Sequence, residues 1–246
     1  MGGCEGGDES SAGKWKSLAR RVLLLLVLAL VMWGYEYSRA IAAEISPEVH
    51  YTTLLWFEEK LFGTPLIVFF QAHRTAVLDY LFSGVYSLHP AYIVLLLLYL
   101  LARNEELYIH AIISVGFAGL IAVVCYVLCP VAPPWIAVPG ITRIQNPVLV
   151  YLGRGHSIDP NPYAAMPSMH VASAVLVGYY LMRAFPGSFV AKITTYSIII
   201  LMPVAVIYTG NHYLLDVIAG LIVAYISLKI ADLAADKLAQ RHYWNF

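Results

Sequence analysis

The chain carries little charge and little cysteine. Only 12% of its 246 residues are charged, against about 25% in ordinary soluble domains, and 60% are hydrophobic. The formal net charge is zero, and no cluster of Lys and Arg is interleaved with aromatic residues in a polar segment. These absences argue against a soluble domain and against nucleic acid as a partner, and they predict a protein that lies in a lipid bilayer.

The three cysteines are Cys4, Cys125 and Cys129. The last two lie inside an apolar run, so we interpret them as reduced packing residues and not as part of a disulfide framework. A metal site at this pair would need more soft ligands nearby. The chain opens with Met-Gly-Gly-Cys, but Gly6 stands where the myristoylation pattern has Ser or Thr, so we expect no acylation signal.

Long apolar runs predict an all-α, polytopic membrane protein. Crossing the hydrocarbon core takes about 20 mostly apolar residues in a helix, and loops cannot face lipid there. We predict six transmembrane helices at roughly 19–39, 80–102, 107–130, 167–185, 191–210 and 212–233. Residues 54–72 are amphipathic, too short in their uncharged part to cross and interrupted by Pro65, which favours an extra interfacial or re-entrant helix.

The runs divide the chain into four parts. These are a disordered cytoplasmic tail (1–18), the first transmembrane helix with the interfacial segment (19–79), a catalytic membrane core (80–236) and a C-terminal tail (237–246). The first apolar run also has features of a signal peptide, with basic residues before it and Ala40-Ile41-Ala42 resembling a cleavage site. Either interpretation places the next loop outside.

Basic residues predict the orientation. With an inside N-terminus, ten of the 15 Lys and Arg residues fall on the cytoplasmic side, and five fall on the other: Arg39, Lys60, Arg74, Arg143 and Arg154. This bias follows the positive-inside rule. We therefore expect a multi-pass protein of the cell membrane with both termini in the cytoplasm and the loop 131–166 outside.

Two segments carry residues suited to chemistry. Pro167 and Ser168 lead into the fourth predicted span, where Ser168 can cap free amides and the helix start can hold an anion beside His170. At the start of the sixth span, His212 and Asp216 are four residues apart and so share a helical face. A carboxylate that orients an imidazole leaves the other ring nitrogen as a nucleophile or base.

The alternating directions of the spans bring these segments together. The end of the third span and the starts of the fourth and sixth open on the same, outer face. The third span ends in a proline-rich lip, 129–135, whose Trp135 can anchor at the interface. We expect His89 to make an ordinary helix–helix hydrogen bond. An ionisable pair buried near a bilayer is costly, so His212 and Asp216 favour a functional role.

These motifs resemble the second and third motifs of the type-2 phosphatidic acid phosphatase superfamily, through the sequence 167–170 and the spacing of His212 and Asp216. The branch with inositol phosphorylceramide synthase is similar over 132–135, 165–170 and 209–216, and also at Asp79 and 85–89. The resemblance covers about 70–236. It implies a six-helix bundle that needs no metal or cofactor and passes through a phosphohistidine.

Carried over by motif, the resemblance makes His212 the nucleophile, Asp216 the residue that orients it and His170 the general acid. The chain departs from the broader family in having no basic residue in the lip and Ala205-Val206 in place of Ser-Arg. The candidates for binding the phosphoryl group are then Ser168, Arg143, Arg154 and Asn211, since phosphoryl transfer depends on positive groups and N–H donors.

The sequence thus predicts a lipid phosphatase or phosphotransferase with an outward-facing site. Its expected substrate is a lipid phosphate or a polyprenyl diphosphate, with water or an alcohol as acceptor. A synthase of the inositolphosphotransferase type is the alternative within this class. Two alternatives lie outside this class. One is a metal-dependent hydrolase, in which His156 could join His170, His212 and Asp216 as a metal ligand. The other is a proton-coupled transporter, for which no internal repeat is visible.

Overall fold

The computed structural model describes residues 11–45, 48–151 and 161–243, and regular structure within these ranges is helical. The helices are α1 (Ser11–Ile45), α2 (Thr52–Phe62), α3 (Leu66–Ala72), α4 (Ala76–Ser87), α5 (His89–Arg103), α6 (Glu105–Leu128), α7 (Pro134–Ala137), α8 (Pro147–Tyr151), α9 (Met169–Ala184), α10 (Phe189–Tyr208) and α11 (Leu214–Tyr243).

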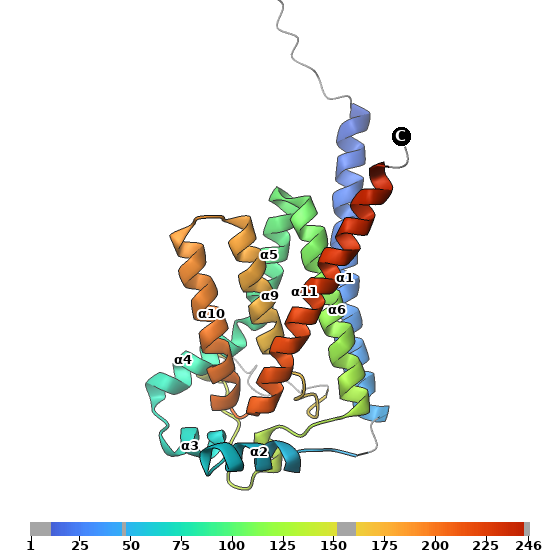
Figure 1. Cartoon of the computed structure of the whole chain (residues 1–246). Helices are drawn as coiled ribbons and strands as arrows, with labels where there is room; N and C mark the ends of the chain where they lie inside the picture. The colour runs from blue at the N-terminus through green and yellow to red at the C-terminus, as the bar shows by residue number, and fades with distance from the viewer. Residues whose placement is uncertain (1–10, 46–47, 152–160, 244–246) are drawn as a thin grey trace, which may run out of the picture.

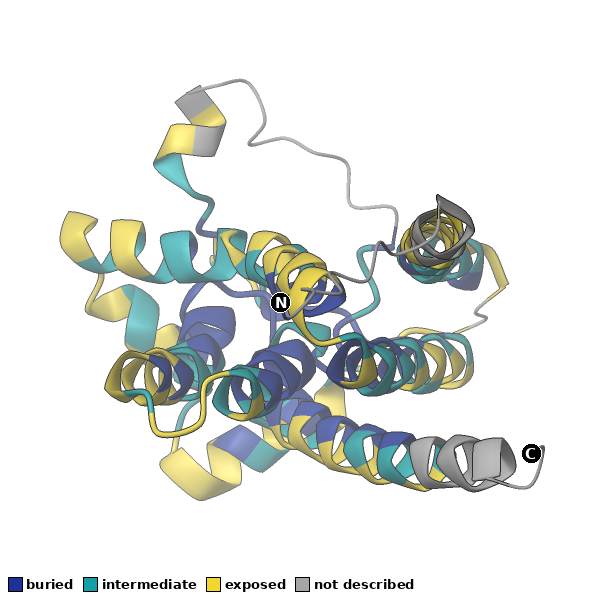
Figure 2. Ribbon diagram, turned by 90° about the horizontal axis from the view of Figure 1, so that it is seen from above, coloured by how far each residue is buried: buried dark blue, intermediate teal, exposed yellow. Residues whose placement is uncertain are grey.

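The long helices stand side by side and the short helices α2 and α3 lie across one end of them (Figure 1). Helix α1 begins, and α11 ends, at the opposite end of the bundle. Helix α9 is central, because it contacts α5, α6, α10 and α11. Seen along the bundle, buried residues face inward and exposed residues line the outer sides of the helices (Figure 2).

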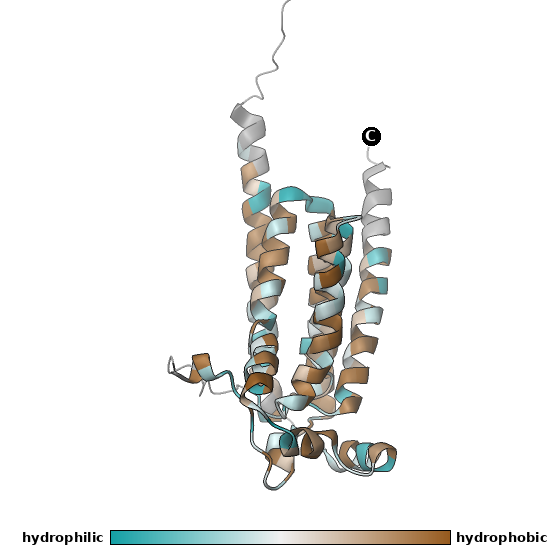
Figure 3. Ribbon diagram, turned by 90° about the vertical axis from the view of Figure 1, so that its left-hand side faces the viewer, coloured by the Kyte–Doolittle hydropathy of each residue, from teal (hydrophilic) through white to brown (hydrophobic). Residues whose placement is uncertain are grey.

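Among the described residues, four helices are long and apolar enough to cross a membrane: the stretches Leu18–Ala42, Glu105–Leu128, Phe189–Tyr208 and Leu214–Ala234. Hydrophobic residues cover most of the length of the upright helices (Figure 3). The chain is therefore a multi-pass membrane protein, as predicted. The pair α4 and α5 gives a fifth span if it crosses as one unit. Helix α9, which corresponds to the fourth predicted span, has 16 residues, so its crossing stays a prediction.

The span predicted over 80–102 consists of two helices. Helices α4 and α5 meet at Leu88 with a bend of 41°. Pro90 explains the break, because proline lacks an N–H and its ring crowds the carbonyl of the residue four positions earlier, here Tyr86. The bend places Tyr86 and His89 together beside the central helix.

The amphipathic stretch 54–72 forms two helices. Helix α2 ends at Gly63, whose φ of 79° is left-handed, and Pro65 precedes α3. Both helices expose aromatic rings, with Trp56 and Phe69 more than half accessible. The position of α2 and α3 at a membrane interface stays a prediction.

The ends of the chain differ in part from the predicted tails. Helix α1 already begins at Ser11, and α11 continues to Tyr243. The remainder of the two predicted tails, 1–10 and 244–246, lies outside the described residues.

Candidate active site

His170 lies in the first turn of α9, at the end of the bundle that α2 and α3 cover. Ser168 caps this helix, since its Oγ accepts from the Val171 N–H at 3.5 Å. The Ser168 N–H donates to the carbonyl of Asp216 at 3.0 Å. Ser168 is fully buried and does not line the site cavity, so its contacts join the start of α9 to α11.

Gly220 makes the close approach of α9 and α11 possible. A Cβ atom at this position would lie 2.5 Å from the carbonyl oxygen of Ser168 and 3.2 Å from Cβ of Val171. The first distance is far below van der Waals contact with a backbone atom, so one helix would have to move. Glycine therefore sets the distance between the helix that carries His170 and the helix that carries Asp216.

His212 lies in the turn before α11, which begins at Leu214. The sequence interpretation placed His212 and Asp216 on one helical face, and this was wrong in detail because His212 precedes the helix. The turn is formed by Gly210, with φ of 79°, and by the His212 N–H, which donates to the carbonyl of Val206 at 3.1 Å. The Asp216 carboxylate still reaches back over the helix start, where its Oδ2 accepts from the Tyr213 N–H at 2.8 Å.

Two acceptors surround Nδ1 of His212. The carbonyl oxygen of Ala165 is 2.8 Å away and Oδ2 of Asp216 is 3.4 Å away. A carbonyl can only accept, so Nδ1 carries the hydrogen and Nε2 keeps its lone pair when the ring is neutral. His212 and Asp216 are both buried. The ring is thus held in the tautomer that a nucleophilic Nε2 requires.

Aromatic rings surround His170. The ring of Tyr86 stacks on it with centroids 4.1 Å apart, and the rings of His89 and His212 lie at 4.3 and 5.8 Å. A nitrogen of His89 is also hydrogen-bonded to Ser173 on α9, which is the helix–helix bond expected from the sequence. Its place among the site histidines was missed, because it comes from the bend between α4 and α5.

A cavity of about 740 Å³ opens onto these rings. Arg39, Arg143, Asn211, His170 and His212 all line it. The guanidinium of Arg143 lies 5.3 Å from the ring centroid of Trp135, and Nδ2 of Asn211 donates to Thr209 Oγ1 at 2.9 Å. Arg154, another predicted phosphate-binding residue, lies outside the described residues.

Arg39 is a lining residue that the sequence analysis did not single out. There, Arg39 was included only among the five basic residues expected on the outer side of the membrane. It pairs with Glu36 at 3.3 Å, and its carbonyl accepts from Asn161 at 3.0 Å. No sequence motif contains it, so only the packing of α1 beside the site shows its position.

The cavity continues between α1 and α6 as a segment that we call the apolar arm. It is lined by Leu30, Val31, Val115, Gly116, Leu120 and Val123. Leu30 and Leu120 keep 65% and 59% of their surface accessible, so the arm reaches the outer surface of the bundle. One cavity therefore joins a cluster of histidines and arginines to a lipid-compatible surface.

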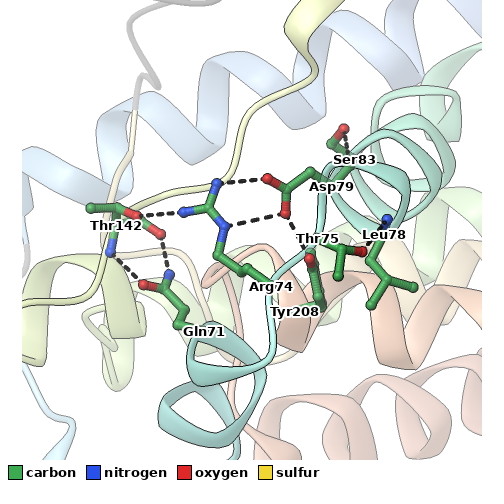
Figure 4. Close-up of polar contacts among 8 residues, drawn as sticks. All are labelled: Gln71, Arg74, Thr75, Leu78, Asp79, Ser83, Thr142 and Tyr208. Atoms are coloured by element: carbon green, nitrogen blue, oxygen red, sulfur yellow. Dashed lines mark hydrogen bonds and ion pairs between the residues drawn. The ribbon is translucent and has the colours of Figure 1, made fainter.

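A polar network fixes the loop that carries Arg143 (Figure 4). Arg74 binds Asp79 through Nε and Nη2, at 3.2 and 2.7 Å, and its Nη1 donates to Thr142 Oγ1 at 3.3 Å. Tyr208 donates to the same carboxylate at 2.6 Å. The hydrogen bond to Asp79 raises the pKa of the Arg74 guanidinium, so this residue remains charged. The network ties α4 and the end of α10 to the loop over the site.

In the described part of the chain, no three His, Cys, Asp or Glu side chains are placed to hold a metal ion together. His156, the additional ligand considered from the sequence, lies outside that part.

The fold and the site define a polytopic helical membrane protein with a cluster of histidines where α9 and α11 begin. The chain belongs to the PAP2 superfamily, whose family model matches residues 52–230.

Two relatives of known name are similar to the chain in sequence. The chain is 27% identical over 238 residues to phosphoinositol dihydroceramide synthase of Bacteroides thetaiotaomicron, an alignment that covers 83% of this chain and 75% of the relative. It is 22% identical over 251 residues to the inositol phosphorylceramide synthase catalytic subunit aur1 of Schizosaccharomyces pombe, covering 91% of this chain and 58% of the relative. No solved structure matches the chain.

The family and these relatives indicate a membrane enzyme that acts on a lipid phosphate as a phosphatase or a phosphotransferase. The resemblance stated from the sequence is confirmed, both for the superfamily and for the branch with inositol phosphorylceramide synthase.

Proposed function

We propose that the protein is a phosphotransferase that moves a phosphorylated polyol from a phospholipid to a lipid alcohol of the ceramide type, with a phosphohistidine intermediate on His212. The cavity carries this proposal. The imidazole of His212, a second histidine and two arginines line one end of it, and its other end is apolar. The names of both relatives describe products that join phosphoinositol to a ceramide, which supports the same substrate class.

In the first half-reaction, Nε2 of His212 attacks the phosphorus of the donor. The new N–P bond forms as the P–O bond to the diacylglycerol oxygen breaks. His170 gives its proton to that oxygen, so diacylglycerol leaves as a neutral alcohol. The ring centroids of His170 and His212 are 5.8 Å apart and both rings line the cavity, so both imidazoles can face one phosphoryl group bound there.

In the second half-reaction, His170 is neutral and takes the proton of the acceptor hydroxyl. The acceptor oxygen attacks phosphorus and the N–P bond breaks, which returns His212 to its starting state with Nδ1 still protonated. If water enters in place of the lipid alcohol, the same steps hydrolyse the intermediate. The choice of acceptor therefore decides between a transferase and a phosphatase.

Positive charge for the phosphoryl group comes, in this proposal, from Arg39 and Arg143, which line the cavity from α1 and from the outer loop. Asp216 stabilises the charge that forms on His212 during the attack. We propose no metal in either step.

We also propose that the site faces outward, because the basic residues are concentrated toward the other end of the bundle. Labelling tests this. In a chain with its cysteines replaced by alanine, Val148→Cys lies in α8, in the loop that also carries Arg143, and Val190→Cys lies in the first turn of α10, at the end of the bundle away from α2 and α3. An impermeant maleimide applied to intact cells should label only Val148→Cys. Labelling of Val190→Cys alone would reverse the orientation.

The function is tested on detergent-purified protein in EDTA. One arm supplies phosphatidylinositol and a fluorescent dihydroceramide, and the other supplies phosphatidate or a polyprenyl diphosphate without an acceptor. We expect a fluorescent inositol phosphoryl lipid from the wild type and none from His212→Ala. Phosphate release without transfer would establish a lipid phosphatase instead. Activity that disappears in EDTA and returns with a divalent ion would contradict the metal-independent mechanism.

A further inference from the structure

Glu58 is a buried carboxylate outside the cavity that nonetheless contacts the segment carrying the nucleophile. It lies on α2, and only 1% of its surface is accessible. Its Oε1 accepts from the Leu214 N–H at 2.7 Å, and its Oε2 accepts from the Leu66 N–H at 2.9 Å. Leu214 and Leu66 are the first residues of α11 and α3. One side chain thus binds the first amide of two helices.

Such amides have no partner within their own helix and need an acceptor from elsewhere when they are buried. Burial raises the pKa of the Glu58 carboxyl, and the two N–H donors act in the opposite direction. The arrangement is costly unless both oxygens are used, and here both are.

The apolar neighbours of Glu58 on α2 contact the same part of the site. Leu54, one helical turn earlier, packs in a cluster with Val131, Ala165 and Tyr213. Ala165 supplies the carbonyl that accepts from His212, and Tyr213 follows His212 in the chain. The buried side of α2 therefore supports His212 from two directions, by packing under Ala165 and Tyr213 and by a hydrogen bond to Leu214.

We propose that Glu58 is a positioning residue for the transfer reaction: it fixes the first turn of α11 and thereby the orientation of His212 and Asp216 toward the phosphoryl group. This role rests on the proposed function of His212. Glu58 does not line the cavity, so it touches neither the substrate nor the reacting atoms. In this proposal, helices α2 and α3 help to hold the catalytic residues in position.

Glu58→Gln tests the proposal, because it keeps the size of the side chain but replaces one acceptor oxygen with an amide that cannot accept. Glu59→Gln is the matched control, since the neighbouring Glu59 is exposed. We expect kcat of Glu58→Gln to fall about 10-fold to 100-fold, the scale of a small misplacement of a reacting group, with KM near that of the wild type. The thermal midpoint should fall modestly, because one buried N–H loses its acceptor. Glu59→Gln should match the wild type in all three.

A second variant removes the same hydrogen bond from its other side. Leu214→Pro deletes the N–H at the first position of α11, where proline suits the helix, and should lower kcat to a similar extent. Hydrogen exchange followed by mass spectrometry gives a readout that needs no turnover: the peptide around 211–217 should exchange faster in Glu58→Gln than in Glu59→Gln.

Wild-type kcat in Glu58→Gln would overturn the positioning role. So would a loss of kcat that follows the loss of thermal stability across the variants, since that is the behaviour of a purely structural residue. If the wild type itself forms no transfer product, the proposed function fails separately. Unchanged exchange around 211–217 would then overturn the positioning role on its own.

Discussion

His212 donates the hydrogen on Nδ1 to the carbonyl oxygen of Ala165 over 2.8 Å. This bond joins the segment just before α9 to the turn just before α11, so the backbone around one site histidine holds the ring of the other. The carboxylate of Asp216 lies 3.4 Å from the same nitrogen. Orientation of the ring and stabilisation of its charge are therefore divided between a neutral acceptor and a charged one.

Asp216→Asn should reduce turnover without abolishing it. The Ala165 carbonyl continues to hold Nδ1, while the negative charge that stabilises the ring during the attack is lost. We expect activity to remain about 10-fold or more above that of His212→Ala, because a residue that orients the nucleophile contributes less than the nucleophile itself. Steady-state transfer assays compare the two. Equal loss in both variants would mean that Asp216 does more than stabilise charge.

Gly220→Ala should separate α9 from α11. The added Cβ meets the Ser168 carbonyl at 2.5 Å, so we expect a loss of about 1–3 kcal/mol of stability from overpacking, together with reduced turnover. Gly84→Ala is the control, because a Cβ at Gly84 meets nothing within 4 Å. Thermal unfolding in detergent measures the difference. A Gly220→Ala protein as stable and as active as the control would show that the helices can move apart freely.

Gly116→Leu should fill part of the apolar arm. A Cβ at this position has only Val31 near it, at 3.9 Å, so the larger side chain extends into the cavity without displacing the backbone. We expect a higher KM for long-chain lipid substrates and little change for short-chain analogues, with Gly84→Leu as the control. Equal effects on both chain lengths would place the lipid chains elsewhere.

Arg39→Ala and Arg143→Ala should each weaken transfer by removing positive charge from the cavity. A fall in kcat/KM of about 100-fold is the scale for losing one donor to a transferring group. Arg183→Ala is the control, since Arg183 lies in the last turn of the helix whose first turn holds His170. Wild-type kinetics in both site variants would remove these arginines from the mechanism.

The fold could largely be predicted from the sequence, because apolar runs of the length of a membrane span have few alternatives. The bend at Leu88 was missed, although Pro90 marks it, since a hydrophobic run alone does not distinguish a straight helix from two joined helices. The division of 54–72 at Gly63 and Pro65 follows from the local sequence, because glycine favours the left-handed end of a helix and proline does not continue one.

The site was predictable where a motif carries it. His170, His212 and Asp216 lie together in the structure, and Arg143 lines the same cavity. Arg39 and Glu58 could not be found from the sequence, because their roles depend on contacts between segments far apart in the chain. Tyr86 lies in the stretch 85–89 that resembled the branch, but the sequence indicated no role for it. Ser168 caps α9, as the sequence predicted, and its side chain is buried in the contact with α11; its part in binding the phosphoryl group stays a prediction.

The most direct test of the account is to trap the covalent intermediate. Purified protein is incubated with phosphatidylinositol alone, quenched, digested and examined by mass spectrometry for an inositol phosphoryl group on the peptide that contains His212, with His212→Ala and Arg183→Ala treated in parallel. The account predicts the modified peptide in the wild type and in Arg183→Ala, and its disappearance when dihydroceramide is added before the quench. Transfer product formed at the normal rate by His212→Ala would contradict it.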